Sequence, residues 1–439
     1  MARHRDSALG WATSMLQSLR IRNFRLFDAI DIDRLARVNL VVGKNNAGKT
    51  CLLEALRLHG DSASAECIRR VLAGRAEDRT EDLTEPAIGE GNGDAPMLDP
   101  IRRLFHGYHL PNDSTAIELG PLHAPTIGAT GYSIRLLLAA FESEAREDET
   151  IQRRIAIETA DEDALIRLLV ERKEHDASWT TLRRRSLRRG PLQVPIRDNE
   201  PSTTRFVGAD THDFEENMEH WRLVAVRPSA RAVVEDALRI IDPEIQEIVV
   251  LPLPRRRGGE AVLIYSDTKR LPLRSLGDGI QRLFQIMLAM VASPGGLVLI
   301  DEFENGLHWS VQRLAWELLF RLTVELDVQL VATTHSWDCI AAFRDAMAAC
   351  KSDDALLLHL GRSTRKSSHG AFVSTHYDRE SLTHVTQAGL VASGPPKQWN
   401  AGRPGPLVHR SIHEPRCAPG ARKDDDTRDS DSLVLEPPP

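Results

Sequence analysis

The stretch that decides the fold is Gly43-Lys44-Asn45-Asn46-Ala47-Gly48-Lys49-Thr50. It fits the P-loop pattern G-x-x-x-x-G-K-[ST], whose glycine-rich backbone cradles phosphate groups. The apolar residues 38–42 before it predict a buried parallel strand, and residues 51–56 after it predict the first turns of a helix. Strand, loop and helix therefore follow one another in the order that phosphate binding requires.

Each part of this loop has a chemical reason to be there. The glycines let backbone N–H groups turn inward around a β-phosphate at the positive end of the helix. The Lys49 amine is long enough to reach the β- and γ-phosphates, and the Thr50 hydroxyl is a ligand that Mg²⁺ accepts. The residues expected to contact nucleotide are Gly43, Asn45, Asn46, Ala47, Gly48, Lys49, Thr50 and Cys51.

Composition narrows the class of protein. The chain has 439 residues, enough for one large domain with insertions or for two or three domains. Its formal charge of −7 means that contact with nucleic acid would need a local basic face. No apolar run approaches the roughly 20 residues of a membrane span, and the N-terminus lacks a secretion signal. The five cysteines show no C-x-x-C spacing, which argues against a zinc site or disulfide framework. We therefore expect a cytoplasmic protein without a membrane partner.

Hydrophobic patterning outlines the rest of the chain. Strands are expected at residues 16–24, 28–32, 126–138, 223–226, 356–360 and 371–376. Helices are expected at 100–107, at 161–173, at 233–241 and from 380, and a hairpin at 245–251 and 261–265. Met15 opens the first alternating run, and we hypothesise that translation starts there.

A second buried strand, residues 296–300, ends in Asp301 and Glu302. This is the Walker B pattern, in which Asp301 would hold the Mg²⁺ hydration shell and Glu302 would orient and polarise the attacking water. Phosphoryl transfer needs that division between one carboxylate for the metal and one for the nucleophile. Without the P-loop upstream, an acidic turn after any core strand would fit the same pattern.

Two further segments add to this site. The strand at 328–334 ends in His335, and the carboxyl ends of parallel strands are where ligands bind in open α/β sheets. A lone histidine is more often structural, so a role at the γ-phosphate depends on the other two strands. Ser275, Gly277 and Gly279 precede a helical run and form a second N-terminal anion site. Because the chain already has its own P-loop, this site suggests a partner's γ-phosphate, bound across a dimer.

Together these segments resemble the ABC-type ATPase head of the SMC, RecF and OLD-like proteins. The motifs that carry the resemblance are the P-loop, Ser275-Leu276-Gly277-Asp278-Gly279-Ile280-Gln281-Arg282, Asp301-Glu302 and Thr333-Thr334-His335-Ser336. The phrases at 19–25 and 300–308 are most similar to OLD-like predicted ATPases of bacteria. The resemblance covers about residues 16–64 and 221–390. It implies an α/β P-loop NTPase fold of the ABC/SMC-head type, with a mixed sheet, a helical signature subdomain and an inserted α+β arm.

The resemblance also implies a head that dimerises around two Mg-ATP. Lys49 and Thr50 of one subunit would face Ser275 and Gly277 of the other, His335 would be the switch histidine, and residues 305–308 would cross the interface. The signature departs from the Leu-Ser-Gly-Gly-Gln of transporters, so which residue takes the serine's role stays open. The glutamine that usually helps to bind Mg²⁺ has no assignment, and we expect its replacement near His106.

Domain limits follow from the same comparison. We expect an extension that is disordered at 1–14, an ATPase domain at 15–390 interrupted by an insertion at about 65–220, and a polar, proline-rich tail that is disordered at 391–439. OLD nucleases add a Toprim domain, which needs a glutamate and a later Asp-x-Asp on ordered strands. Here the only Asp-x-Asp triplets after His335 lie at 424–426 and 429–431, in the tail. We therefore predict no intrinsic nuclease activity.

Two functions remain after these steps. The first is an ATP-hydrolysing switch that acts on DNA or on a partner effector in repair or phage defence. The alternative is a nucleotide-gated binding module with little turnover that controls a separate nuclease or toxin. A transporter subunit and a small-molecule kinase fit the motifs less well. The basic runs at 183–189 and 255–257 would either contact DNA phosphates or form solvated loops paired with nearby acids.

Overall fold

The computed structural model describes residues 15–75, 77, 98–108, 115–123, 131–145, 150–155, 165–174, 178, 180–186, 203–209, 214–252, 259–365 and 368–387. The expected extension at 1–14, the tail at 391–439 and the second basic run at 255–257 lie outside these residues. The backbone of the first basic run is described only as far as Ser186.

The main sheet positions the P-loop. Its strands follow the order β16-β15-β3-β14-β13-β9. All neighbours in this sheet are parallel except β15 and β16. The strands are β3 (Val38–Gly43), β9 (Thr204–Val207), β13 (Leu297–Ile300), β14 (Gln329–Thr333), β15 (Ala355–Arg362) and β16 (Phe372–Tyr377). The predicted P-loop strand is therefore β3, near the middle of a mixed sheet.

A second, antiparallel sheet carries the N-terminus in the order β2-β1-β4-β5-β7-β8, with β6 paired to β5. Its strands are β1 (Leu19–Phe24), β2 (Phe27–Ile32), β4 (Ile117–Gly120), β5 (Tyr132–Ala145), β6 (Thr150–Ile155), β7 (Leu165–Glu174) and β8 (Thr180–Ser186). The region of the expected insertion thus extends the sheet of β1 and β2 and adds β9 to the main sheet. The domain limits themselves stay a prediction.

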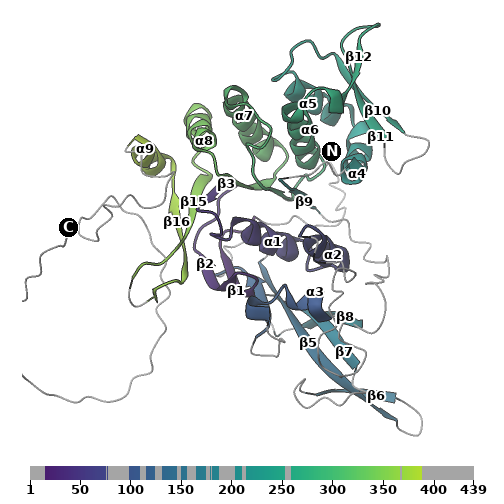
Figure 1. Cartoon of the computed structure of the whole chain (residues 1–439), viewed down its shortest axis with the longest axis vertical. Coiled ribbons are helices and arrows are strands. Elements are labelled where there is room, and N and C mark those ends of the chain that lie inside the picture. The colour runs from purple at the N-terminus through teal and green to yellow at the C-terminus, as the bar shows by residue number, and fades with distance from the viewer. Residues whose placement is uncertain are drawn as a thin grey trace, which may run out of the picture.

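Helices cover both faces of the main sheet (Figure 1). On one side lie α1 (Lys49–Gly60) and α2 (Ala65–Ala73), between the two sheets. On the other side lie α6 (Asp278–Val291), α7 (Trp309–Glu325), α8 (Trp337–Ala349) and α9 (Arg379–Gln387). Next to α6 are α4 (Phe214–Ala225), α5 (Pro228–Leu238) and the hairpin β10 (Glu247–Pro252) and β11 (Gly259–Ile264), which β12 (Arg270–Pro272) joins. Shorter pieces are α3 (Leu98–Arg102), η2 (His106–Tyr108) and η4 (Leu273–Ser275).

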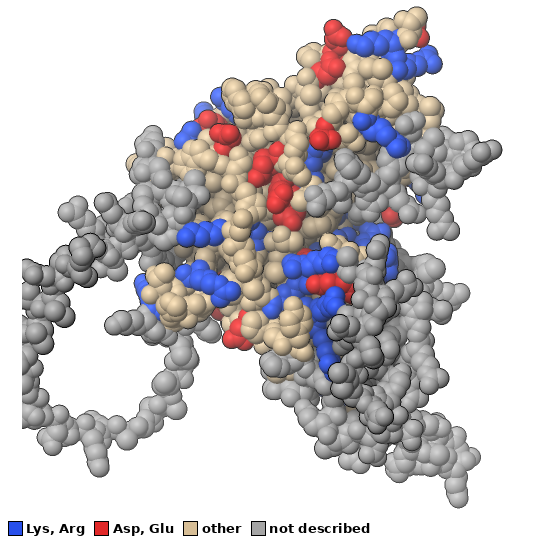
Figure 2. Space-filling view, in the orientation of Figure 1, with Lys and Arg blue, Asp and Glu red and all other residues tan. Residues whose placement is uncertain are grey.

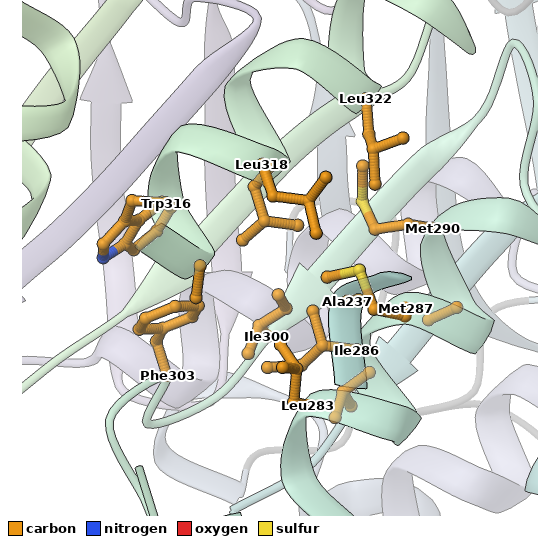
Figure 3. Close-up of a cluster of buried hydrophobic side chains, with 14 of the residues drawn as sticks. Ala237, Leu283, Ile286, Met287, Met290, Ile300, Phe303, Trp316, Leu318 and Leu322 are labelled. Carbon is orange, nitrogen blue, oxygen red and sulfur yellow. The ribbon is translucent and has the colours of Figure 1, made fainter. Parts of the chain in front are cut away.

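Strand alternation divides the interior into two cores. In β3, Leu40 and Val42 face the core under α6 to α8, while Val41 faces the core around α1. Figure 3 shows the first core, where Ile300 of β13 lies against residues of α6 and α7. There the ring of Trp316 stacks on Phe303 with centroids 4.1 Å apart. The residue just after the Walker B carboxylates is therefore buried, which anchors the start of the following loop.

The structure overturns two element predictions. Residues 161–173 were expected to form a helix, but Leu165–Glu174 is strand β7, paired with β5 and β8. Leu168 and Val170 face one core and Leu169 faces a second cluster, so both faces of β7 are buried. The sequence therefore lacks the polar and apolar alternation by which a strand is recognised. Residues 223–226 were expected to form a strand, but all except Val226 lie in α4.

In α4 the buried positions follow a helical spacing. Trp221 and Val224 are buried and Met218 packs against the same core, whereas Leu223 and Val226 are exposed. Spacing of three residues is that of one helix face. The predicted hairpin, the helix at 233–241 and the strands at 28–32, 356–360 and 371–376 are confirmed to within a few residues.

Candidate active site

Close packing explains why the P-loop glycines are glycines. At Gly43, the end of β3, a Cβ atom would lie 2.5 Å from the Leu360 carbonyl oxygen of β15. At Gly48, which precedes α1, a Cβ would lie 2.5 Å from the Phe27 ring, and the backbone φ is +92°. Asn46 also has a positive φ of 63°. The loop is therefore held between a strand of the main sheet and the β1–β2 hairpin.

Lys49 points back over this loop. Its Nζ atom donates to the carbonyl oxygens of Gly43 at 2.9 Å and Lys44 at 3.3 Å. The same atom lies 3.3 Å from Nδ1 of His335, at the end of β14. Lys49 of the P-loop and His335, the expected switch histidine, are therefore in contact although they lie 286 residues apart in the sequence.

Burial lowers the pKa of Lys49, and the nearby carboxylates Asp301, Glu302 and Glu304 oppose that shift. Phosphate oxygens placed beside this partly desolvated amine would favour its charged form, as the carboxylates do.

Asp301 is fixed on both carboxylate oxygens. Thr50 donates its hydroxyl to Oδ2 at 2.9 Å, and Thr333 donates to Oδ1 at 2.5 Å. The Asp301 backbone N–H donates to the Val207 carbonyl at 2.8 Å. Mg²⁺ in nucleotide sites typically takes one or two protein oxygens and fills its other positions with water and phosphate. The adjacent Thr50 hydroxyl and Asp301 carboxylate fit that donor set.

Glu302 and His335 lie side by side at the mouth of this site. The Glu302 carboxylate is 3.6 Å from Nε2 of His335, and both side chains are about two-fifths exposed (41% and 40%). Since Nδ1 of the same ring contacts Lys49, the imidazole lies between a cation and a carboxylate. The His335 backbone N–H donates to Glu304 at 2.7 Å, which fixes the loop after β14.

Glu302 has an unusual backbone. Its φ is +49°, in the left-handed region that non-glycine residues rarely adopt. Its N–H donates to the Thr333 hydroxyl at 2.9 Å. The strained conformation lies at the turn after β13, where the Glu302 side chain is partly exposed and faces His335.

The signature residues lie at the exposed start of α6. Ser275 donates its hydroxyl to the Pro272 carbonyl at 2.7 Å, and the Gly277 carbonyl accepts from Gln281 at 3.3 Å. Gly279 packs so closely on Gly306 that a Cβ would lie 2.7 Å from its carbonyl oxygen. Within the described chain, neither Ser275, Gly277 nor Gly279 forms a hydrogen bond with the subunit's own P-loop.

Sequence reasoning assigned no role to two charged residues that lie in the site, Arg282 and Glu304. Arg282 is 5% exposed and donates to the carbonyl oxygens of Gly208 at 2.5 Å and Glu302 at 3.0 Å, and also to that of Asp301. Burial lowers the pKa of Arg282 to about 10, so it stays a cation at neutral pH. The sequence held one indication of this role: Arg282 is the single charged residue in the otherwise uncharged run 280–291.

His106, near which we expected a replacement for the Mg²⁺-binding glutamine, lies at the β1–β2 turn. Its Nδ1 atom is 2.9 Å from the Arg25 carbonyl oxygen. Residues 109–114 are outside the described chain, so this expectation stays a prediction.

Sequence comparison finds two matching family models. Residues 15–87 match a family described as "AAA ATPase domain", and residues 140–338 match one described as "AAA domain, putative AbiEii toxin, Type IV TA system". A Helicobacter pylori protein described as an ATP/GTP phosphatase is 23% identical over 351 residues, which cover 74% of this chain and 86% of that protein. An uncharacterized protein of Methanocaldococcus jannaschii is 35% identical over 66 residues, covering 14% of this chain and 30% of that protein.

Similar solved structures include SMC heads. A head bound to the C-terminal winged-helix domain of ScpA aligns over 83% of this chain and 98% of that one, with a TM-score of 0.43 and 13% identity. The SMC head of Thermotoga maritima aligns over 82% and 97%, with a TM-score of 0.35 and 13% identity. The nucleotide-binding motifs and the family matches, rather than these low TM-scores, show the type of domain.

The chain therefore matches AAA-type ATPase domains over residues 15–87 and 140–338. Its fold is that of a P-loop NTPase, with a mixed sheet and helices on both faces. On the face of the ATPase shown in Figure 2, basic and acidic side chains are interspersed among the described residues. None of the helices in the described ranges has the length and apolar character needed to cross a bilayer.

Proposed function

We propose that this ATPase is an ATP-hydrolysing molecular switch that dimerises around two Mg-ATP. The observation that carries the proposal is the meeting of five side chains at the ends of three strands, β3, β13 and β14. Lys49 and Glu302 contact opposite nitrogens of the His335 ring, and Asp301 is hydrogen-bonded to Thr50, the residue after Lys49.

Each residue has a defined task in hydrolysis. The P-loop amides and Lys49 bind the phosphates, while Thr50 and Asp301 would hold Mg²⁺. Mg²⁺, when bound, neutralises negative charge on the β- and γ-phosphate oxygens. Glu302 accepts a hydrogen bond from the attacking water and orients it, as a carboxylate at a solvent-open turn can. His335, which lies between Lys49 and Glu302, would contact the γ-phosphate.

The exposed start of α6 supports the dimer. Ser275 and Gly277 are exposed and directly precede the N-terminus of the 14-residue helix α6. Backbone N–H groups at such a terminus bind anions. Because, among the residues that the structure describes, these form no hydrogen bond with their own P-loop, we infer that a second copy of the chain would bring its nucleotide to them.

Turnover and assembly test the proposal together. We expect the wild-type protein to hydrolyse ATP with Mg²⁺, and Lys49→Ala to lose nucleotide binding. Glu302→Gln should bind ATP and elute as a dimer in size-exclusion chromatography with light scattering, because it cannot complete hydrolysis. A Glu302→Gln protein that stays monomeric at saturating Mg-ATP would overturn the sandwich.

DNA and a separately encoded effector are candidate partners, in repair or in phage defence. ATPase rates measured with and without DNA across a salt series separate them. Stimulation that weakens steeply with salt supports contact with the phosphate backbone, and rates indifferent to DNA at every salt concentration remove that partner.

A second candidate is a nucleotide-gated regulatory module with little turnover, which controls a separate nuclease or toxin. The matched family description that names a toxin favours it. It predicts ATP bound at one per chain without steady-state phosphate release, and an effector that co-purifies only in the presence of nucleotide.

A further inference from the structure

Arg282 is a buried cation whose hydrogen bonds, among the described residues, all go to backbone carbonyl oxygens. In the part of the chain that the structure describes, its guanidinium forms no ion pair with a carboxylate. It donates instead to three carbonyl oxygens, those of Gly208 after β9 and of Asp301 and Glu302 after β13. One side chain of α6 therefore holds the ends of two strands of the main sheet.

Packing alone does not call for a charge at this position. Leu283 and Ile286, one and four positions further along the helix, are fully buried hydrophobic residues. Removing a guanidinium from water costs several kcal/mol unless hydrogen bonds and nearby charge compensate. An apolar residue of similar volume would pack α6 against β13 without that cost. The carbonyls that it contacts are the feature that requires an arginine here.

Those carbonyls belong to the two Walker B residues. Glu302 has a φ of +49°, and holding a non-glycine residue in such a region costs about 1–3 kcal/mol. Its N–H is tied to Thr333 and its carbonyl to Arg282. The Asp301 N–H is tied to Val207 and its carbonyl to Arg282 as well. Arg282 thus contributes to the orientation of both peptide groups.

The same helix begins at the exposed signature. Its first turn packs on the loop after Glu302, where Gly279 lies against Gly306 and Gly306 lies against Asp278. Because a helix is stiff over one turn, a ligand that shifts the Ser275 and Gly277 end also shifts Arg282. Because Arg282 donates to the Glu302 carbonyl, a movement of Arg282 would also move that carbonyl.

We propose that Arg282 is a positioning residue that couples ligand binding at the exposed start of α6 to the orientation of Glu302 in the same subunit. This inference rests on the proposed hydrolytic function and adds its regulation. Arg282 does not touch the substrate; it acts through the backbone of Asp301 and Glu302.

The test uses the full-length protein and two variants. Arg282→Lys keeps the charge but lacks the planar fork that reaches several carbonyls at once. We expect kcat to fall about 100-fold, as misplacing a catalytic group by about 1 Å does, while the KM for ATP stays within a factor of about three. Arg282→Lys should still dimerise with Mg-ATP and melt near the wild-type temperature.

Arg282→Ala leaves a space the size of a guanidinium ion. Added guanidinium at low millimolar concentration should restore kcat in this variant, since the free ion can donate to the same carbonyls. The matched control is Glu302→Gln, whose rate guanidinium must not raise. A purely structural arginine would show neither the separation of kcat from KM nor rescue.

The outcomes separate the two proposals. A wild-type protein that hydrolyses ATP and an Arg282→Lys variant with unchanged kcat would overturn the coupling role alone. Loss of nucleotide affinity and melting temperature in parallel, without rescue, would do the same. A wild-type protein without turnover would overturn the proposed function, and the coupling role with it.

Discussion

At the scale of single residues, Gly48 carries the sharpest geometric demand in the P-loop. Its φ of +92° disfavours any side chain, and a Cβ would come within 2.5 Å of the Phe27 ring. Phe27 is fully buried in the second core, so the ring cannot yield easily. We predict that Gly48→Ala lowers the free energy of unfolding by about 2–3 kcal/mol, measured by denaturant titration. The variant should also bind ATP weakly in calorimetry.

A matched control isolates the contact from the backbone. Gly295 has a similar φ of +69°, but nothing lies within 4 Å of the place where its Cβ would be. Gly295→Ala should therefore show only the backbone penalty, about 1 kcal/mol, and bind ATP normally. Equal losses in the two variants would contradict the role given to Phe27.

His220 makes stability depend on pH. It is 4% exposed on α4, and burial, together with Arg205 and Arg70, lowers its pKa from 6.5 to about 3. Between these values the unfolded chain binds a proton that the folded chain does not, so stability falls as pH falls below 6.5. The loss from His220 should reach about 2 kcal/mol at pH 5.

Urea unfolding of the wild-type protein and His220→Asn at pH 7 and pH 5 measures this contribution. The asparagine variant has no ionisable group here, so it should lose about 2 kcal/mol less between the two pH values. Other titrating groups, such as the buried His59, affect both proteins alike and cancel in the difference. Equal losses would show that His220 does not keep its lowered pKa.

At the scale of elements, the sequence predicted best where local and tertiary preferences agree. β3, β13 and β14 are buried, mutually parallel strands, and a predicted motif lies at the carboxyl end of each: the P-loop, Asp301-Glu302 and His335. β7 was missed because its two faces are both covered, which no pattern within the segment reveals. The convergence of Lys49, Asp301 and His335 was predictable from motifs, since carboxyl ends of parallel strands share one edge.

The role of Arg282 was not predictable in the same way. Its partners are backbone carbonyls of Gly208, Asp301 and Glu302, and a carbonyl has no sequence signature. Only the fold brings the ends of β9 and β13 to the second turn of α6. The same holds for Glu304, whose partner is the backbone N–H of His335.

At the scale of the whole molecule, the proposed nucleotide sandwich predicts that each site depends on two chains. Lys49→Ala disables the P-loop and leaves the signature intact. Ser275→Arg does the reverse, because it places a bulky cation at the exposed start of α6. Each variant alone should be inactive: in a homodimer, every composite site contains one damaged half.

Mixing the two variants distinguishes a dimer of heads from independent heads. In a mixed dimer one site pairs the intact P-loop of the Ser275→Arg chain with the intact signature of the Lys49→Ala chain, and its other site is damaged on both sides. Random pairing makes half of the dimers mixed, so an equimolar mixture should recover about one quarter of wild-type ATPase activity if sites act independently. Recovery of less than one quarter of the activity would mean that hydrolysis at one site requires an intact second site. Heads that work alone would leave Ser275→Arg active before any mixing, because the signature would then serve no second chain.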